Sequence, residues 1–526
     1  MLKNKFWFLS LLLIIYLCIV VESQDWPMLQ HDAQHTGRTS ISVVPGNTAK
    51  WVWVDESHIT TNFVSQANVS INYPSTRTVI LAGDVQPIVA ENKVFFGATN
   101  GEFYALNGTN GATVWKKQLK RAILHTAAYA SSTVVTGCMD GKIYAFNAGD
   151  GVQKWVYATG AGISVAPIIV NNVVYVGSRD GYFYAINLGD GSLKWRYKTI
   201  ADNANHVHSG APIMQSAAAS TDGTKIFFGA ENMYFYCLDA SNGTEIWRKK
   251  LGGMSFQYSW PVVYNNIVMT FVTVPRGLSE NVMESELDSL PAKGSSESVF
   301  DYAARIWPQE RTVIRNWLAA NPLYRNFYVM DINTGNSPYS EEVPMGRVGG
   351  IGYPGRAPVI DNQNRILMYW RVRSATFMDG TGTYGTKYPP DISAMDPATG
   401  DRIWLNIKAS GWFQNELDNN YVLTVGGNYL YLNNHMRWSN CINLTNGNVK
   451  YITRALENWD GTSWRWTNCL IWIGNDGTNS MPPPSLHRSP QGDCGVVIAS
   501  INGTPTLIIQ ESGHYQINFG CIAAIQ

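Results

Sequence analysis

Alternating apolar and polar residues predict short β-strands along most of this chain. Tyr182 to Asn187 alternates in this way, as a strand packed in a sheet does. The turn dipeptide Asp180-Gly181 precedes this strand, and Gly189-Asp190-Gly191 leads from it into a second short strand that carries Trp195. Such turn sequences join antiparallel strands. The whole stretch, GSRDGYFYAINLGDGSLKW, therefore predicts an antiparallel pair with its turns.

The same phrase occurs three times at one fixed spacing. It reads GATNGEFYALNGTNGATVW from Gly97 to Trp115 and GCMDGKIYAFNAGDGVQKW from Gly137 to Trp155. A period near 40 with four short strands per unit is typical of a β-propeller. The predicted fold class is therefore all-β, a β-propeller of four-stranded blades.

The number of blades follows from the residue that ends the third strand of each unit. Eight positions correspond to Asn187, and they are Asn107, Asn147, Asn187, Asp239, Asp331, Asp396, Asn443 and Gln526. These positions predict eight blades. The last four units match the repeat less well, so a seven-bladed ring with one degenerate unit stays an alternative.

The two ends of the chain predict how the ring closes. Gly520 to Gln526 aligns with Gly181 to Asn187, so the C-terminus supplies the third strand of a unit and stops. The segment Lys50 to Val54 has the pattern of an outer strand without its first three strands. An N-terminal outer strand that completes the C-terminal blade would leave no open edge at the join. We therefore expect an N-terminal segment with the closing strand at 24–54 and the propeller at 55–526.

The first 23 residues have the pattern of a secretory signal peptide. Lys3 and Lys5 precede an apolar run, and Val21 and Ser23 are small enough for a cleavage site after residue 23. This pattern predicts a secreted, periplasmic or envelope-associated protein with no membrane-spanning segment after cleavage. An uncleaved N-terminal anchor stays an alternative, and the residues before Cys18 do not fit a lipoprotein signal.

The total charge of the chain argues against some classes of partner. Lys+Arg and Asp+Glu both number 39, so the total charge favours neither nucleic acid nor an anionic membrane.

Tryptophan recurs at the outer-strand position of the repeat, where we expect it to pack between neighbouring blades of a monomeric ring. These tryptophans are Trp51, Trp115, Trp155, Trp195, Trp247 and Trp404.

Six of the seven cysteines lie beyond the signal peptide, so disulfides are possible in an exported chain. Cys469 and Cys494 flank one long insertion and form the most plausible pair. The alternative is that all six are buried free thiols on strands.

Five insertions interrupt the repeat, and their places predict a binding face. They fall either between second and third strands or between a fourth strand and the next blade, and these connections share one face of a propeller. They are residues 55–84, 200–210, 275–324, 372–390 and 455–492. Because loops carry function more often than the repeats that support them, we expect binding on this face. Accumulation of insertions at tolerant connections is the alternative.

Two of the insertions have a recognisable character. Residues 278–320 show helical apolar spacing, which predicts two short helices that cap the face. Residues 455–492 contain Trp459, Trp464, Trp466 and Trp472. Clustered tryptophans can stack on sugars or quinones, or they can pack beneath their own loop.

The repeat resembles the pyrroloquinoline-quinone (PQQ) repeat family. Ala394 to Trp404, AMDPATGDRIW, fits the motif A-x-D-x-x-T-G-x-x-x-W of that family at every position. The resemblance covers nearly the whole chain from Trp26 onward and implies an eight-bladed propeller. The family includes quinoprotein alcohol dehydrogenases and the non-catalytic propeller of the outer-membrane protein assembly machinery. A resemblance of fold says little about activity.

Two functions follow from this resemblance. The favoured one is a non-enzymatic secreted or periplasmic scaffold that binds a protein or glycan partner at the insertion face, with no cofactor and no catalytic residues. The alternative is a dehydrogenase of alcohols or sugars that depends on PQQ and Ca²⁺. Under the alternative, cofactor-binding candidates near the starts of inner strands are Arg356, Trp260, His125, Gln86 and His208, with Ser164 in a comparable place. Only Asp84 offers a carboxylate there, so no metal site is predicted.

Overall fold

The computed structural model describes the chain in many short ranges and a few long ones. The described residues are 25–44, 48–56, 58–64, 81–82, 85–201, 210–257, 259–274, 289–292, 294–297, 299–341, 343, 357–370, 376–378, 384–386, 391–403, 422–433, 439–445, 449–453, 456–459, 464–468, 474–475, 496–511 and 521–526.

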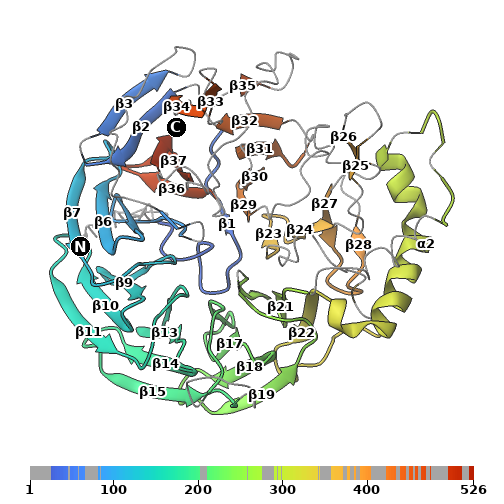
Figure 1. The fold of residues 1–526 in the computed structure, drawn as a ribbon, viewed down its shortest axis with the longest axis horizontal. Coiled ribbons are helices and arrows are strands. Elements are labelled where there is room, and N and C mark those ends of the chain that lie inside the picture. Colours follow the sequence, from blue (N-terminus) through green and yellow to red (C-terminus); the bar gives the residue numbers. More distant parts are fainter. Residues whose placement is uncertain are drawn as a thin grey trace, which may run out of the picture.

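The fold is the predicted all-β propeller, with eight blades arranged in a ring (Figure 1). The seven-bladed alternative is therefore wrong. Blades 1 to 4 each contain four antiparallel strands in chain order, from the inner strand to the rim. Blade 1 contains β4 (Ile88–Ala90), β5 (Lys93–Gly97), β6 (Glu102–Asn107) and β7 (Thr113–Gln118), and blade 2 contains β8 (Ala128–Ala130), β9 (Thr133–Cys138), β10 (Lys142–Asn147) and β11 (Gln153–Ala158). Blade 3 contains β12 (Ile168–Val170), β13 (Val173–Gly177), β14 (Tyr182–Asn187) and β15 (Leu193–Lys198), and blade 4 contains β16 (Ala218–Ala219), β17 (Lys225–Gly229), β18 (Tyr234–Asp239) and β19 (Glu245–Lys250).

Blades 5 to 8 follow the same plan less regularly. Blade 5 has three described strands, and blade 7 gains one strand on each side. Blade 5 contains β20 (Val262–Tyr264), β21 (Ile267–Phe271) and β22 (Phe327–Asp331), and blade 6 contains β23 (Val359–Ile360), β24 (Ile366–Trp370), β27 (Asp391–Met395) and β28 (Arg402–Ile403). Blade 7 contains β1 (Arg38–Thr39), β29 (Val422–Gly426), β30 (Tyr429–Asn433), β31 (Ser439–Asn443), β32 (Val449–Thr453) and β35 (Gly474–Asn475). Blade 8 contains β36 (Val497–Ile501), β37 (Thr504–Glu511), β38 (Cys521–Ile525) and β2 (Thr48–Asp55).

The ring closes as the chain ends predict. Strand β2 pairs antiparallel with β38, in a register that places Trp51 opposite Ala524 and Trp53 opposite Ile522. A further strand, β3 (His58–Val64), pairs with the outer edge of β2 and makes blade 8 five-stranded. The sequence predicts only a loop there, because the hairpin lacks the repeat's own turn sequence.

The helical prediction is correct in one part. The structure has one 22-residue helix, α2 (Val299–Ala320), followed by the short 3₁₀ helix η1 (Pro322–Tyr324). Helix α2 lies at the outer rim beside β28 (Figure 1), where Trp307 Nε1 donates a hydrogen bond to Asp401 Oδ1 at 3.3 Å. The described helix is therefore single and long rather than one of two short caps. The first predicted helix falls on residues that are largely outside the described part.

Two hairpins complete the described insertions. They are β25 (Thr376–Met378) with β26 (Tyr384–Thr386), and β33 (Leu456–Trp459) with β34 (Trp464–Asn468). The first hairpin lies between the second and third strands of blade 6, and the second lies between blades 7 and 8. We call the face of these connections the insertion face. The connections between first and second and between third and fourth strands define the opposite, turn face.

Alternation explains why the outer strands form. In β15, Trp195 is buried whereas Lys194, Arg196 and Lys198 are exposed, as expected for a strand that packs on one side only. The turn before β15 requires glycine at Gly191. Its φ is +74°, and a Cβ there would lie 2.7 Å from the ring of Trp155 in the preceding blade.

The centre of the ring is filled by residues 25–43, which we call the strap (Figure 1). Its carbonyl groups accept hydrogen bonds from inner-strand N–H groups of blades 1, 2, 4, 5, 6 and 7. The donors are Val89, Tyr129, Ala219, Val263, Ile360 and Val425, with distances of 2.7–2.9 Å. Inner strands otherwise present open edges to the channel. The strap pairs those edges and ties early and late blades to one segment.

Candidate functional site

Five of the predicted inter-blade tryptophans lie in the described part, and each forms a joint to the next blade. The indole N–H donates to the carbonyl that follows the third strand of that blade, and the ring covers a glycine of its turn. The bonds run from Trp51 to Gly108, Trp115 to Ala148, Trp155 to Leu188, Trp195 to Ala240 and Trp247 to Ile332, at 2.7–3.1 Å. These tryptophans have a structural task and do not face a ligand site. Trp404 lies outside the described residues.

Gln86 holds the strap where the sequence suggested a cofactor contact. Its side-chain Oε1 accepts hydrogen bonds from Trp26 Nε1 at 3.2 Å and from the Gln30 backbone N–H at 2.7 Å. Gln86 and Trp26 are both buried. The described amide oxygen therefore contacts the strap rather than an open channel.

His35 anchors the strap to blade 5. Its Nδ1 lies 2.9 Å from the Pro261 carbonyl oxygen, next to the buried Trp260, and the ring is fully buried. Burial lowers the pKa of His35 to about 4, against weaker opposing effects of the Pro261 carbonyl and Asp32; His125 adds to the decrease. A neutral imidazole with its proton on Nδ1 fits this contact.

His125 and Ser164 contact neighbouring polar groups of the ring. His125 Nδ1 accepts a hydrogen bond from the Thr126 N–H at 2.9 Å, and Nε2 lies 3.4 Å from Ser216 Oγ. Ser164 Oγ accepts a hydrogen bond from Arg179 Nε at 3.0 Å. Arg356, His208 and Asp84 lie outside the described residues, so the structure does not place them with this set.

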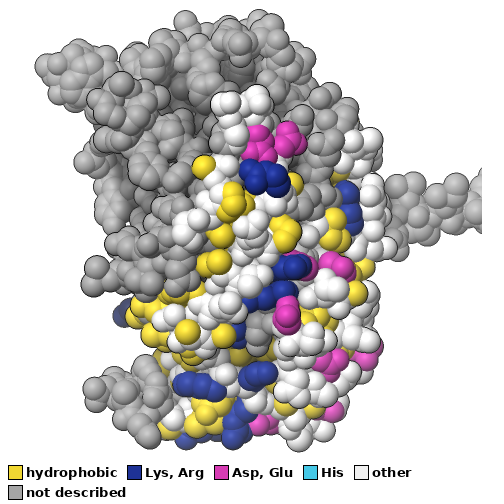
Figure 2. Space-filling view, turned by 90° about the vertical axis from the view of Figure 1, so that its right-hand side faces the viewer, with side chains coloured by type: hydrophobic (Ala, Val, Ile, Leu, Met, Phe, Trp, Pro, Cys, Tyr) yellow, Lys and Arg dark blue, Asp and Glu magenta, His cyan; other side chains and the backbone are white. Residues whose placement is uncertain are grey.

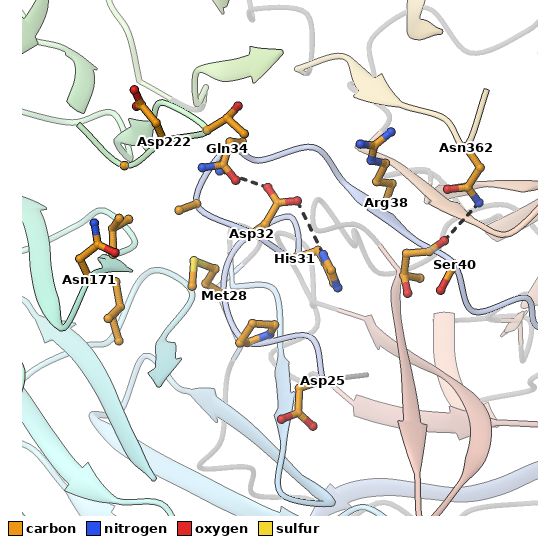
Figure 3. Close-up of a pocket in the computed structure, with 17 residues that line it drawn as sticks. Asp25, Met28, His31, Asp32, Gln34, Arg38, Ser40, Asn171, Asp222 and Asn362 are labelled. Atoms are coloured by element: carbon orange, nitrogen blue, oxygen red, sulfur yellow. Dashed lines mark hydrogen bonds and ion pairs between the residues drawn. The ribbon is translucent and has the colours of Figure 1, made fainter. Parts of the chain in front are cut away.

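One pocket of about 890 Å³ opens beside the strap at the turn face (Figure 3). It is bordered by strap residues and by the first turns of blades 3, 4 and 6, which contribute Asn171, Asp222 and Asn362. Among the described residues, the strap's backbone carbonyls bond no inner-strand N–H of blade 3, and Ile169 of β12 lines the pocket. The pocket therefore opens where the strap passes a blade without pairing to it.

Carboxylates dominate the charge of this pocket. Burial acts to raise the pKa of Asp32, but interactions with His31 and hydrogen bonds from Thr36 together lower it below its ordinary value. The hydroxyl of Ser220 and the N–H and hydroxyl of Thr224 lower the pKa of Asp222 to about 2. Both groups are ionised at neutral pH. Such a pocket attracts small cations or polar molecules rather than anions.

The strap contacts part of the residue set that the sequence offers for PQQ. Trp26 and Gln30 bind Gln86, and His35 binds the carbonyl of Pro261, the neighbour of Trp260. In the described part of the chain, no three His, Cys, Asp or Glu side chains lie close enough together to hold a metal ion.

Three cysteines of the described part are buried. They are Cys138, Cys237 and Cys441. Burial raises the pKa of Cys138 to about 11 and that of Cys237 to about 12, which keeps both thiols protonated and unreactive. Cys469 and Cys494 lie outside the described residues, so their pairing stays a prediction.

The described part of the chain is a repeat propeller, and its own N-terminal segment lies in the central channel. Residues 99–225 match the PQQ-repeat family model described as "Outer membrane protein assembly factor BamB". The resemblance inferred from the repeat motif is thus supported by an independent match. No curated protein matches the sequence.

Solved structures share this fold at low sequence identity. The quinohemoprotein alcohol dehydrogenase of Comamonas testosteroni is 11% identical, with a TM-score of 0.55, over 95% of this chain and 80% of that one. A europium-containing methanol dehydrogenase is also 11% identical, with a TM-score of 0.55, over 96% and 99% of the two chains. BamB from Moraxella catarrhalis is 13% identical over 86% and 99%, with a TM-score of 0.45. For the two dehydrogenases, at these identities, the likeness shows the fold alone.

The strap is the feature that the repeat pattern did not reveal. Its sequence, DWPMLQHDAQHTGRTS, precedes the first copy of the repeat. Trp26, Met28 and Leu29 are apolar residues in a segment without strand periodicity, and all three are buried. Apolar residues with no element of their own are the signal that this segment packs against something else.

Proposed function

We propose that this chain is a non-enzymatic binding propeller that uses its insertion face to hold a partner, with a protein as the first candidate and a glycan as the second. The observation that supports this proposal is the strap, because it binds Gln86, a candidate for cofactor binding, and Pro261, the neighbour of the candidate Trp260. The match to the BamB family model over residues 99–225 points the same way.

We further propose that the protein is secreted, periplasmic or associated with the cell envelope, as a single propeller. The support is the signal-like pattern of residues 1–23, which lie outside the described part of the structure. No helix in the described part of the chain is long and apolar enough to span a membrane.

A cofactor-binding experiment separates this proposal from the PQQ-dependent dehydrogenase. Purified protein is incubated with PQQ and Ca²⁺, desalted, and assayed for quinone absorbance and for dye-linked oxidation of alcohols and sugars. We expect the absorbance to be lost on desalting and the dye to stay oxidised. Retained quinone together with substrate oxidation would establish the dehydrogenase instead.

A loop replacement tests the binding face itself. In blade 6, Trp370 of β24 pairs with Asp391 of β27, so a two-residue Asn-Gly turn in place of residues 371–390 should close a regular hairpin. Partners are captured with the intact chain and identified. We expect the replacement to lose partners that the control Asp190→Asn, in a turn of the opposite face, retains. Equal capture by both variants would move the binding site away from this loop.

A further inference from the structure

The outer strands of blades 1 to 4 form a surface of one charge, although the chain as a whole is neutral. Strands β7, β11, β15 and β19 follow one another along the rim of the ring (Figure 1). Together they carry nine basic residues and one acidic residue, Glu245. We call these nine residues the basic belt: Lys116, Lys117, Lys154, Lys194, Arg196, Lys198, Arg248, Lys249 and Lys250.

Strand geometry makes the charges of the belt act together. Lys194, Arg196 and Lys198 alternate along β15 and are all exposed. Residues two apart on a strand are about 7 Å apart, which is less than the screening length of about 8 Å at physiological salt. Figure 2 views the molecule from the side of α2, and at its lower end several Lys and Arg side chains lie on the surface with Asp and Glu side chains near them.

Most of the belt is not neutralised within the described structure. Lys116 pairs with Glu56 at 2.9 Å and with Glu102 at 3.3 Å, and Arg248 pairs with Glu245 at 2.6 Å. Among the described residues, the other seven cations have no ion-pair partner. Their positive charge is therefore available to a partner.

Aromatic and apolar groups lie between the cations. The Arg196 guanidinium lies 4.8 Å from the centre of the Tyr182 ring, and Lys250 Nζ lies 4.9 Å from the centre of the Tyr234 ring. Val156 of β11 and Ile246 of β19 are 43% and 42% exposed. The belt thus combines sites for anionic groups with apolar surface that suits the faces of sugar rings.

We propose that the basic belt is a docking surface for an acidic polysaccharide, a partner additional to any that binds the insertion face. Charge complementarity selects an anion, and the mixture of cations with tyrosine and aliphatic surface favours a sugar polymer. The four strands lie on a convex arc (Figure 1). A flexible chain can follow this arc, whereas a flat membrane or a stiff duplex touches only part of it.

The test compares two variants with the same change in total charge. Lys194→Glu/Lys198→Glu alters the belt, and Lys120→Glu/Arg121→Glu alters two exposed cations in the loop after β7. Affinities for a polyuronate, for dextran sulfate and for neutral dextran are measured by calorimetry at low and physiological salt. We expect both anionic polymers to bind, neutral dextran not to bind, and the belt variant to lose at least about tenfold in affinity. The control variant should lose much less.

Several outcomes would overturn the proposal. Equal losses in the two variants would show an effect of total charge only, and binding of neutral dextran would remove the role of the cations. Tighter binding to polyglutamate, to single-stranded DNA or to phosphatidylserine vesicles would assign the belt to another class of partner. Melting curves of both variants, and Lys194→Gln/Lys198→Gln as a milder change, separate lost binding from lost folding. Because the belt lies apart from the loop of residues 371–390, partner capture by the insertion face should survive in the belt variant.

Discussion

Blades 1 to 4 and blade 5 use the same joint but build it from different residues. In blades 1 to 4 every joint has a tryptophan on a complete fourth strand, as Trp195 on β15 shows. In blade 5 the tryptophan is replaced by Tyr339, which follows β22 without a described fourth strand. Its hydroxyl donates to the Pro397 carbonyl at 3.3 Å, and its ring covers Gly400.

The difference shows which part of the joint is indispensable. In blades 1 to 4 and in blade 5, an aromatic ring covers a glycine of the next blade, and its N–H or O–H group donates a hydrogen bond to a carbonyl of that blade. Tryptophan and the fourth strand are one way to supply it. In blade 5, helix α2 adds further support, because Arg311 and Trp307 both contact Asp401 of blade 6. The following variants test this comparison.

The largest effect should come from Trp195→Ala. This change removes a buried ring and the hydrogen bond to Ala240, so we expect a loss of about 3–5 kcal/mol in the free energy of unfolding. Thermal melting followed by near-UV circular dichroism measures it. Trp195→Phe is the control, since it keeps most of the packing and should cost clearly less. An unchanged melting curve for Trp195→Ala would contradict the assigned role of the joint.

Acid should weaken the strap that ties the two halves together. His35 keeps a pKa of about 4 in the folded protein, whereas an ordinary histidine titrates at 6.5. Between pH 6.5 and 4 the unfolded chain gains this proton and the folded chain does not. The free energy of unfolding should therefore fall as the pH falls, by up to about 3 kcal/mol from this group, with no contribution above pH 7.

Urea unfolding at several pH values measures this effect. His35→Asn is the matched variant, because its amide can still donate to the Pro261 carbonyl but does not titrate. The difference between the two proteins isolates the histidine from the carboxylates. If both lost stability equally between pH 6.5 and 4, His35 would not be responsible.

A smaller effect is expected from Gly191→Ala in the regular half. The new methyl group would lie 2.7 Å from the Trp155 ring, at a residue with a positive φ. We expect a loss of about 2 kcal/mol, which combines backbone strain with displacement of the ring. Gly189→Ala in the same turn is the control, because a Cβ there meets nothing within 4 Å. Equal melting temperatures for the two variants would remove the close approach as the reason for glycine.

The smallest effect should come from Tyr339→Ala in blade 5. Tyr339 is only partly buried, and α2 supports the same region, so we expect a loss of about 1–2 kcal/mol. Thermal melting compares it directly with Trp195→Ala. A loss as large as that of Trp195→Ala would show that the joint is equally strong in both halves.

Much of the architecture could be predicted from the sequence, because each copy of the repeat has the same strand pattern and the same turn residues. The phrase from Gly177 to Trp195 specifies a strand pair, a glycine turn and a buried indole, and each copy makes the same local contacts. The alignment of Gly520–Gln526 with Gly181–Asn187 was sufficient to predict the pairing of β2 with β38. The strand β3 was missed, because pairing with an existing edge requires little sequence specificity.

The sequence says less about the candidate site, for a related reason. Gln86, His125 and Trp260 are candidates because of their place in the repeat, and Gln86 contacts the strap. What occupies the channel depends on the strap, which has no repeat partner in the sequence. The neutral total charge likewise gave no indication of the basic belt, since a sum over 526 residues says nothing about where charges gather.

The sequence alone therefore determined the period, the eight strand sets, the order of blades and the aromatic joints, because these arise from contacts within one repeat or between neighbouring repeats. The tertiary structure decided three other features: the strap in the channel, the pocket beside blade 3, and the row of cations on four outer strands. Each of these requires residues far apart in the chain to meet. The alternation of apolar and polar residues and the residue types of the turns carry no information about contacts between distant parts of the chain.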